Sequence, residues 1–147
     1  MNREMNSMSK TFYGQTDVGL KRSSNQDCFY AEGFEDGKII TLVCDGMGGE
    51  SYGELASGIA VETIAAHAAN VYESGEDFSF AISNSLDDAN TRICAEINAR
   101  GKRMGTTLAA VYAVKGKFYC VNIGDTRIYH YSKGILEQIS FDHTHAQ

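Results

Sequence analysis

The sequence has no proline and no tryptophan in 147 residues, and only four cysteines. Without proline, no Pro-rich linker marks a domain boundary. The composition, 43% hydrophobic and 22% charged, is typical of one soluble globular domain. The cysteines are scattered without a CxxC pair, which disfavours a zinc knuckle or a disulfide framework. We interpret Cys28, Cys44, Cys94 and Cys120 as reduced and mostly buried thiols.

Long apolar runs are also absent. The apolar stretches fall far short of the ~18 residues that a membrane-spanning helix needs, and the first residues, MNREMNSMSK, contain no signal-peptide core. The formal charge of −6 disfavours nonspecific nucleic-acid binding, which relies on clustered Lys and Arg. We therefore predict a cytoplasmic protein that binds neither nucleic acid nor membrane, and whose charge suits the binding of cations.

The hydrophobic pattern predicts strands, then two helices, then strands again. Strands are expected at residues 11–17, 27–32 and 38–44, and later at 106–114, 117–123, 126–131 and 135–139. Between them, from Gly53 onward, two apolar stripes of helical period meet at a break at Ser74 and Gly75. The stripes comprise Val61, Ile64, Ala65, Ala68, Val71 and Tyr72, and then Phe78, Ile82, Leu86, Ala89, Ile93 and Ile97. We predict an α+β domain in which two antiparallel helices use these stripes for core packing.

The stretch LVCDGMGG, residues 42–49, ends an apolar strand at Asp45 and follows it with three glycines. An isolated Asp-Gly pair is usually an ordinary turn. However, Asp27 lies at the mouth of an earlier strand, and Asp125 ends the strand FYCVNI in the turn GDTR. Magnesium and manganese prefer oxygen ligands, including backbone carbonyls that glycine allows to come close. The combination favours a divalent-cation site, although each aspartate alone is more often structural.

Other catalytic motifs do not match. The sequence has no EF-hand spacing, no GxxxxGK[ST] loop, no GxSxG elbow and no HExxH helix. Of the four histidines, only His143 and His145 are close in sequence, and a lone pair at this spacing is more often structural than metal-binding. A serine or cysteine nucleophile is therefore not indicated.

Five motifs in order resemble those of the bacterial metal-dependent serine/threonine protein phosphatases of type 2C, the PPM family. They are TDVGLKRSSNQD, LVCDGMGGESYGELAS, MGTTL, VNIGDTRIY and, after a basic-glycine turn, FDHT. The resemblance covers residues 11 to 145. It implies that residues 11–147 are the N-terminal portion of a PPM-type phosphatase domain, preceded by a polar extension at residues 1–10.

The resemblance also implies a β-sandwich flanked by antiparallel helices, with a binuclear Mn²⁺ or Mg²⁺ centre at its edge. Asp45 matches the carboxylate that bridges both metals, the Gly46 carbonyl matches a second ligand, and Asp27 matches an acidic residue that acts largely through metal-bound water. Asp125 matches a ligand of a possible third metal, and Arg22 matches the arginine that grips the substrate phosphate. Two positions depart from common members: Met47 stands where eukaryotic relatives have histidine, and Gln26 stands where many members have glutamate.

The activity implied is hydrolysis of phosphoserine and phosphothreonine proteins by a metal-bound hydroxide, with Arg22 and Asp45 as the catalytic residues. The family pattern continues beyond FDHT to two further metal-binding aspartates, whereas this sequence stops at Gln147. Three hypotheses follow: an active phosphatase domain or its N-terminal portion, a noncatalytic module that binds a phosphoprotein or regulatory partner, and a truncated product of little function. We expect residues 1–147 alone to bind metal weakly, to have little activity, and to associate with itself or a partner through an exposed sheet edge.

Overall fold

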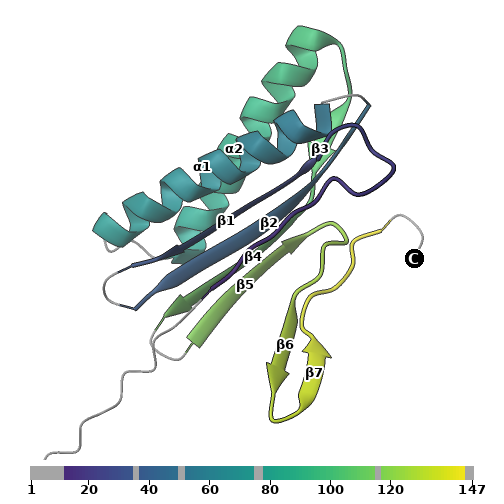
Figure 1. The fold of residues 1–147 in the computed structure, drawn as a ribbon. Helices are drawn as coiled ribbons and strands as arrows, with labels where there is room; N and C mark the ends of the chain where they lie inside the picture. Colours follow the sequence, from purple (N-terminus) through teal and green to yellow (C-terminus); the bar gives the residue numbers. More distant parts are fainter. Residues whose placement is uncertain (1–11, 35–36, 50–51, 75–77, 115–116, 145–147) are drawn as a thin grey trace, which may run out of the picture.

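The computed structural model describes residues 12–34, 37–49, 52–74, 78–114 and 117–144 (Figure 1). The elements are β1 (Asp27–Gly33), β2 (Ile39–Gly48), α1 (Tyr52–Ser74), α2 (Phe78–Arg100), β3 (Met104–Thr106), β4 (Leu108–Val114), β5 (Lys117–Ile123), β6 (Tyr129–Ser132) and β7 (Ile135–Gln138). This order confirms the predicted α+β class. Within the described residues, neither helix combines the length and the apolar character that crossing a membrane requires.

The main sheet is antiparallel and has the strand order β1-β2-β4-β5, with the short β3 paired to the end of β2. In the described part of the chain, β6 and β7 form a separate two-stranded hairpin beside the main sheet (Figure 1). Helices α1 and α2 run antiparallel to each other and cover one face of the main sheet (Figure 1). Among the described residues, no helix covers the opposite face of the sheet.

Alternation along β2 decides which side chains reach the helices. Ile40, Leu42 and Cys44 are at most 1% exposed and belong to the same buried cluster as Ile64 of α1. Residues between them point the other way, because successive side chains of a strand leave opposite faces of the sheet. Asp45 is one of these, so its carboxylate lies on the face opposite the helices.

The helix predictions are confirmed. Helix α1 starts at Tyr52, one residue before the predicted start, and ends at Ser74 as expected. Five predicted stripe residues are buried: Val61, Ile64, Ile82, Ala89 and Ile93. The side chains of Val71, Tyr72 and Phe78 lie outside the described residues. Apolar stripes of this period bury a helix face because every third or fourth residue returns to the same side.

Three strand predictions need correction. The described residues 12–17 form no strand; they lie along the open face of the sheet, where Gly14 packs against the Phe29 ring. The predicted strand 106–114 is divided at Thr107, whose side chain takes the place of a backbone group in the pairing with Asp45. The predicted strand 126–131 begins only at Tyr129.

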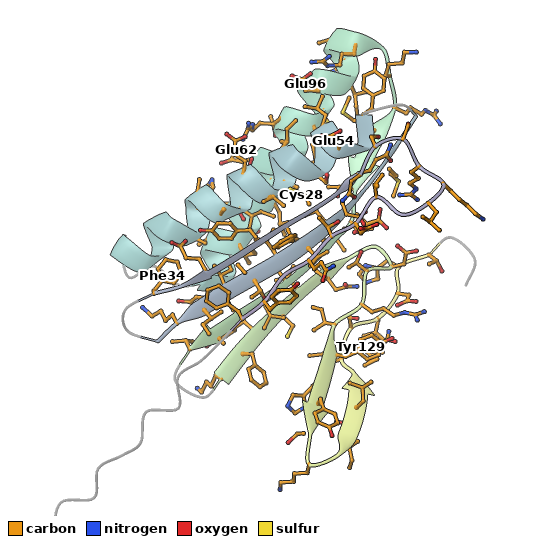
Figure 2. All side chains as sticks on the ribbon, viewed as in Figure 1. Cys28, Phe34, Glu54, Glu62, Glu96 and Tyr129 are labelled. Carbon is orange, nitrogen blue, oxygen red and sulfur yellow. The ribbon has the colours of Figure 1, made fainter. Side chains whose placement is uncertain are left out.

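The cysteine prediction is confirmed in part. All four thiols are free, but Cys94 and Cys120 are exposed, so burial applies only to Cys44 and in part to Cys28. Cys28 and Cys44 are opposite each other in the register of β1 and β2, without a disulfide. Figure 2 shows Cys28 between the sheet and α1. Burial raises the pKa of Cys44 to about 12, which keeps this thiol protonated and unreactive at neutral pH.

Candidate metal centre

Asp27 and Asp45 face each other across β1 and β2. Their Cα atoms are direct partners in the antiparallel register, so both side chains leave the same face of the sheet. Like charges placed directly opposite are unfavourable. The structure therefore brings together the two carboxylates that the sequence singled out, in an arrangement that needs a cation or a proton between them.

The electrostatics of Asp45 show how the other predicted residues converge. Its pKa is raised, chiefly because neighbouring protein atoms partly remove the carboxyl from water although the residue as a whole is exposed, and further because Asp27 acts as a neighbouring negative charge and a hydrogen-bond partner. Asp125 adds to this rise in the pKa of Asp45, whereas the positive charge of Arg22 lowers it. The other three predicted side chains thus all influence the pKa of Asp45, near the end of β2.

One oxygen of this site is left without a partner. Asp27 Oδ1 is buried and accepts no hydrogen bond from the residues that the structure describes. A buried carboxylate oxygen without a donor is unfavourable, and a hard divalent cation is an alternative partner. The orphaned oxygen and the facing carboxylates together fit Mg²⁺ or Mn²⁺. Among the described residues, however, no group of three or more His, Cys, Asp or Glu side chains is arranged to hold a metal ion.

The loop that carries Arg22 is folded back onto β1 by side-chain hydrogen bonds. Asn25 Nδ2 donates to Thr16 Oγ1 at 2.8 Å, and the Asp27 backbone N–H donates to Asn25 Oδ1 at 3.0 Å. Gly19 has a φ of 71° and donates its N–H to Asp17 Oδ1, which turns the chain at the loop's tip. These contacts hold the loop that carries the exposed Arg22, whose positive charge acts on Asp45.

Asp125 lies in a turn that is held by hydrogen bonds to residues near the end of the described chain. Gly124 has a φ of 92°, and its carbonyl accepts hydrogen bonds from Asn122 Nδ2 and from the His143 backbone N–H. Asn122 Nδ2 also donates to the Phe141 carbonyl at 2.8 Å. The FDHT motif therefore stabilises the GDTR turn by hydrogen bonds, and His143 takes part with its backbone N–H.

The glycines after Asp45 allow α1 to pass close to β2. A Cβ on Gly46 would lie 2.0 Å from the Gly53 carbonyl oxygen, and a Cβ on Gly53 would lie 2.5 Å from Gln26 Oε1. In contrast, a Cβ on Gly49 would meet no atom within 4 Å. The predicted role of the Gly46 carbonyl as a metal ligand stays a prediction, but the requirement for glycine there already follows from packing.

Gln26 forms hydrogen bonds to both β2 and α1. Its Nε2 donates to the Gly48 carbonyl at 3.2 Å, and its backbone carbonyl accepts from the Gly46 N–H and from the buried Ser57 hydroxyl. A glutamate at this position could not donate to a carbonyl. The departure from the family's common glutamate therefore contributes a hydrogen bond as well as making the site less negative.

Sequence reasoning missed the residues that hold the Asp45 backbone. The Asp45 N–H donates to Thr107 Oγ1 at 2.9 Å, and the Asp45 carbonyl accepts from the Thr107 N–H at 2.9 Å and from Thr106 Oγ1 at 3.1 Å. Thr107 is only 3% exposed, and its hydroxyl also contacts Thr126 Oγ1. The MGTTL motif marked these threonines, but its sequence alone gives no sign that they oppose Asp45.

We predict that Thr107→Val will destabilise the chain and loosen Asp45. Valine keeps the shape of threonine but leaves the Asp45 N–H without its acceptor, a loss of about 1–3 kcal/mol for a buried polar group. Chemical denaturation followed by circular dichroism measures this change. Thr106→Val is the matched control, because the Asp45 carbonyl would keep the Thr107 N–H. Equal stability of the two variants would contradict this role of Thr107.

Comparisons with known proteins identify relatives for most of the chain. The family described as protein phosphatase 2C matches residues 20–146. The serine/threonine protein phosphatase PstP of Mycobacterium tuberculosis is 33% identical over 138 residues, which cover 92% of this chain and 26% of the relative. The serine/threonine phosphatase stp of Listeria monocytogenes is 29% identical over 136 residues, which cover 88% of this chain and 53% of the relative.

Solved structures agree with these sequence matches. The crystal structure of the M. tuberculosis phosphatase PstP/Ppp superposes with a TM-score of 0.76 at 32% identity, covering 87% of this chain and 52% of that one. The catalytic domain of PstP in complex with two manganese ions gives a TM-score of 0.74 at 31% identity, covering 89% of this chain and 55% of that one. The chain therefore spans about half the length of these solved domains.

Proposed function

Because the chain belongs to the protein phosphatase 2C family, we propose that it supplies the N-terminal part of a metal-dependent phosphatase site that hydrolyses phosphoserine and phosphothreonine esters in proteins. The observation that carries this proposal is the pairing of Asp27 with Asp45 on the open face of the sheet. It is supported by the manganese pair in the similar PstP domain.

Asp45, the Gly46 carbonyl and Asp27 would hold the binuclear Mn²⁺ or Mg²⁺ centre, and Asp125 would contribute to a weaker third site. A bound pair of divalent cations supplies Lewis-acid activation of water for attack on phosphorus. Thr107 positions Asp45 by binding both polar groups of its backbone. Asp27 keeps one oxygen free of protein hydrogen bonds within the described part of the chain, and this oxygen is available to a cation or its water.

Arg22 would bind the substrate phosphate. Arg22 is exposed in the loop before β1, and its positive charge lowers the pKa of Asp45, which supports this proposal. A guanidinium presents a planar set of donors that matches two phosphate oxygens. A phosphate that Arg22 binds would thus be held close to the carboxylate of Asp45.

A noncatalytic phosphatase-like module is the second candidate. It is favoured by the small number of ligands, since only two carboxylates face each other and no larger metal-binding group lies among the described residues. Such a module would bind a phosphoprotein or regulatory partner. Pairing through a sheet edge and a cytoplasmic location also stay predictions.

The experiment compares two proteins: this chain, and this chain joined to the C-terminal half of the Listeria monocytogenes phosphatase stp. Manganese-dependent hydrolysis of p-nitrophenyl phosphate and of a phosphothreonine peptide is measured for both. We expect activity from the joined protein and little from the chain alone, because metal affinity rises with the number of carboxylate ligands. A folded, manganese-binding joined protein without activity would favour the noncatalytic module.

In the joined protein, Arg22→Ala should lower kcat/KM by about tenfold to a hundredfold. A charge-assisted hydrogen bond to phosphate contributes about 1.5–3 kcal/mol, and loss of that energy in the transition state gives this range. Steady-state kinetics with the phosphothreonine peptide provide the measurement. Lys21→Ala removes the neighbouring exposed charge but keeps Arg22, and it should leave kcat/KM within about twofold if the guanidinium of Arg22 is the group that binds phosphate. A change in melting temperature alone, with normal kinetics, would refute the role of Arg22.

A further inference from the structure

A groove between α1 and α2 lies apart from the proposed phosphatase site. Its volume is about 670 Å³, within the range of ligand-binding pockets. It is lined by Glu54, Leu55, Gly58, Ile59 and Glu62 of α1 and by Arg92, Ala95 and Glu96 of α2. Figure 2 labels Glu54, Glu62 and Glu96 along the helix pair. Nothing in the phosphatase mechanism uses these residues.

The groove combines an apolar lining with acidic side chains. Leu55, Ile59 and Ala95 supply apolar surface, whereas the three glutamates supply negative charge. Arg92 crosses between the helices, since its guanidinium donates to Glu62 Oε2 and to Thr63 Oγ1, both at 2.7 Å. A surface of this kind is complementary to a chain segment with an apolar side chain flanked by cations.

Two of the three glutamates that line the groove have an arginine partner. Glu62 pairs with Arg92, and Glu96 pairs with Arg100 at 2.6 Å one helical turn away. Glu54 has no ion-pair partner in the part of the chain that the structure describes. Glu62 and Glu96 are thus already ion-paired within the chain, and Glu54 is the lining carboxylate that is available to a cation from outside.

Gly58 provides an independent observation about the same groove. It lies in the interior of α1, where glycine is less favourable than alanine because it loses more backbone freedom on folding. A Cβ at this position would meet no atom within 4 Å, whereas Gly46 and Gly53 are held close by neighbouring backbone or side chains. Packing within the described structure thus gives no reason for glycine at 58, and its effect is to keep the groove open.

We propose that this groove binds a basic, apolar segment of a partner protein, in which Lys or Arg pairs with Glu54 and an apolar side chain lies over Gly58. The proposal does not depend on phosphatase activity. A basic partner is preferred to a second copy of this chain, because two chains that each carry a net charge of −6 repel one another.

The test uses fluorescence anisotropy with a labelled helical peptide of Lys, Leu and Ala, and with a matched peptide in which Glu replaces Lys. The full chain should bind the Lys peptide saturably, more weakly as salt is raised, and should not bind the Glu peptide. Binding of both peptides, or of neither, would overturn the proposal. So would self-association of the chain, detected by sedimentation, that occupies the groove.

Variants localise the binding. Gly58→Trp fills the groove and Glu54→Lys reverses its available charge, and each should weaken binding of the Lys peptide about tenfold or more. Glu137→Lys, on the exposed β7, changes the net charge equally and should have little effect. If it weakens binding as much as Glu54→Lys, the attraction is nonspecific. Gly58→Ala should raise the melting temperature, because alanine favours the helix and its Cβ would meet no atom within 4 Å. Gly58→Trp should keep the circular dichroism spectrum of the parent chain, so that its loss of binding reflects the filled groove.

Discussion

Asp45→Asn should remove most of the Mn²⁺ affinity of this chain. The substitution keeps the size of the side chain but replaces one of the two facing carboxylates, Asp27 and Asp45, with a neutral amide. Because affinity for hard divalent cations depends on the charge and number of oxygen ligands, we expect a loss of tenfold or more. Titration calorimetry with Mn²⁺ measures it. Asp87→Asn, an exposed change on α2, is the control and should bind Mn²⁺ as the parent chain does.

The same substitution should have the opposite effect on the metal-free protein. Burial and the charge of Asp27 raise the pKa of Asp45 above its ordinary value of 3.8 in the folded state. Between that value and the raised one, the folded chain holds a proton that the unfolded chain has lost, so stability falls as pH rises through this window. At neutral pH the ionised Asp45 therefore opposes folding, and asparagine removes this opposition.

Thermal unfolding with a chelator tests this second effect. Asp45→Asn should melt at a higher temperature than the parent chain at pH 7, and the difference should shrink toward pH 4. Added Mn²⁺ should raise the melting temperature of the parent chain and not that of the variant. Lower stability of the metal-free variant at every pH would show that Asp45 is a structural residue and would count against the metal centre.

Periodicity made the helices predictable. The stripe from Ile82 to Ile93 repeats every three or four residues, and a pattern of that period specifies one buried face whatever it packs against. Residues 12–17 show the limit of such reasoning. Their pattern suits a strand, but a strand also needs a backbone partner, and the described chain places them over Phe29 without one.

The residues of the candidate site could be predicted from the sequence, but their positions relative to one another could not. Asp27 and Asp45 could be selected because each lies at the end of an apolar run, but only the β1–β2 register shows that they are direct partners. A shift of one residue would put the two carboxylates on opposite faces of the sheet. Thr107 illustrates the same limit, because its contact with Asp45 joins segments 62 residues apart.

Gly46→Ala should be the most destabilising of the small substitutions considered. The added Cβ would lie 2.0 Å from the Gly53 carbonyl oxygen, 2.5 Å from the Gly53 carbonyl carbon and 2.6 Å from the Gln26 carbonyl oxygen. All three atoms belong to backbone, so no side-chain rotation relieves the contact. Overpacking a core typically costs about 1–3 kcal/mol, and we expect this variant at the upper end or beyond.

Chemical denaturation measures the free energy of unfolding of Gly46→Ala, and Gly49→Ala is its control. Both substitutions act in the same glycine-rich stretch, but a Cβ on Gly49 would meet nothing within 4 Å. We expect Gly49→Ala to stay within about 0.5 kcal/mol of the parent chain, as surface substitutions usually do. If Gly46→Ala were equally stable, the approach of α1 to β2 could not be what requires glycine at 46. The remaining reason would be the path of the Gly46 carbonyl toward a bound metal, and the variant should then lose Mn²⁺ affinity without losing stability.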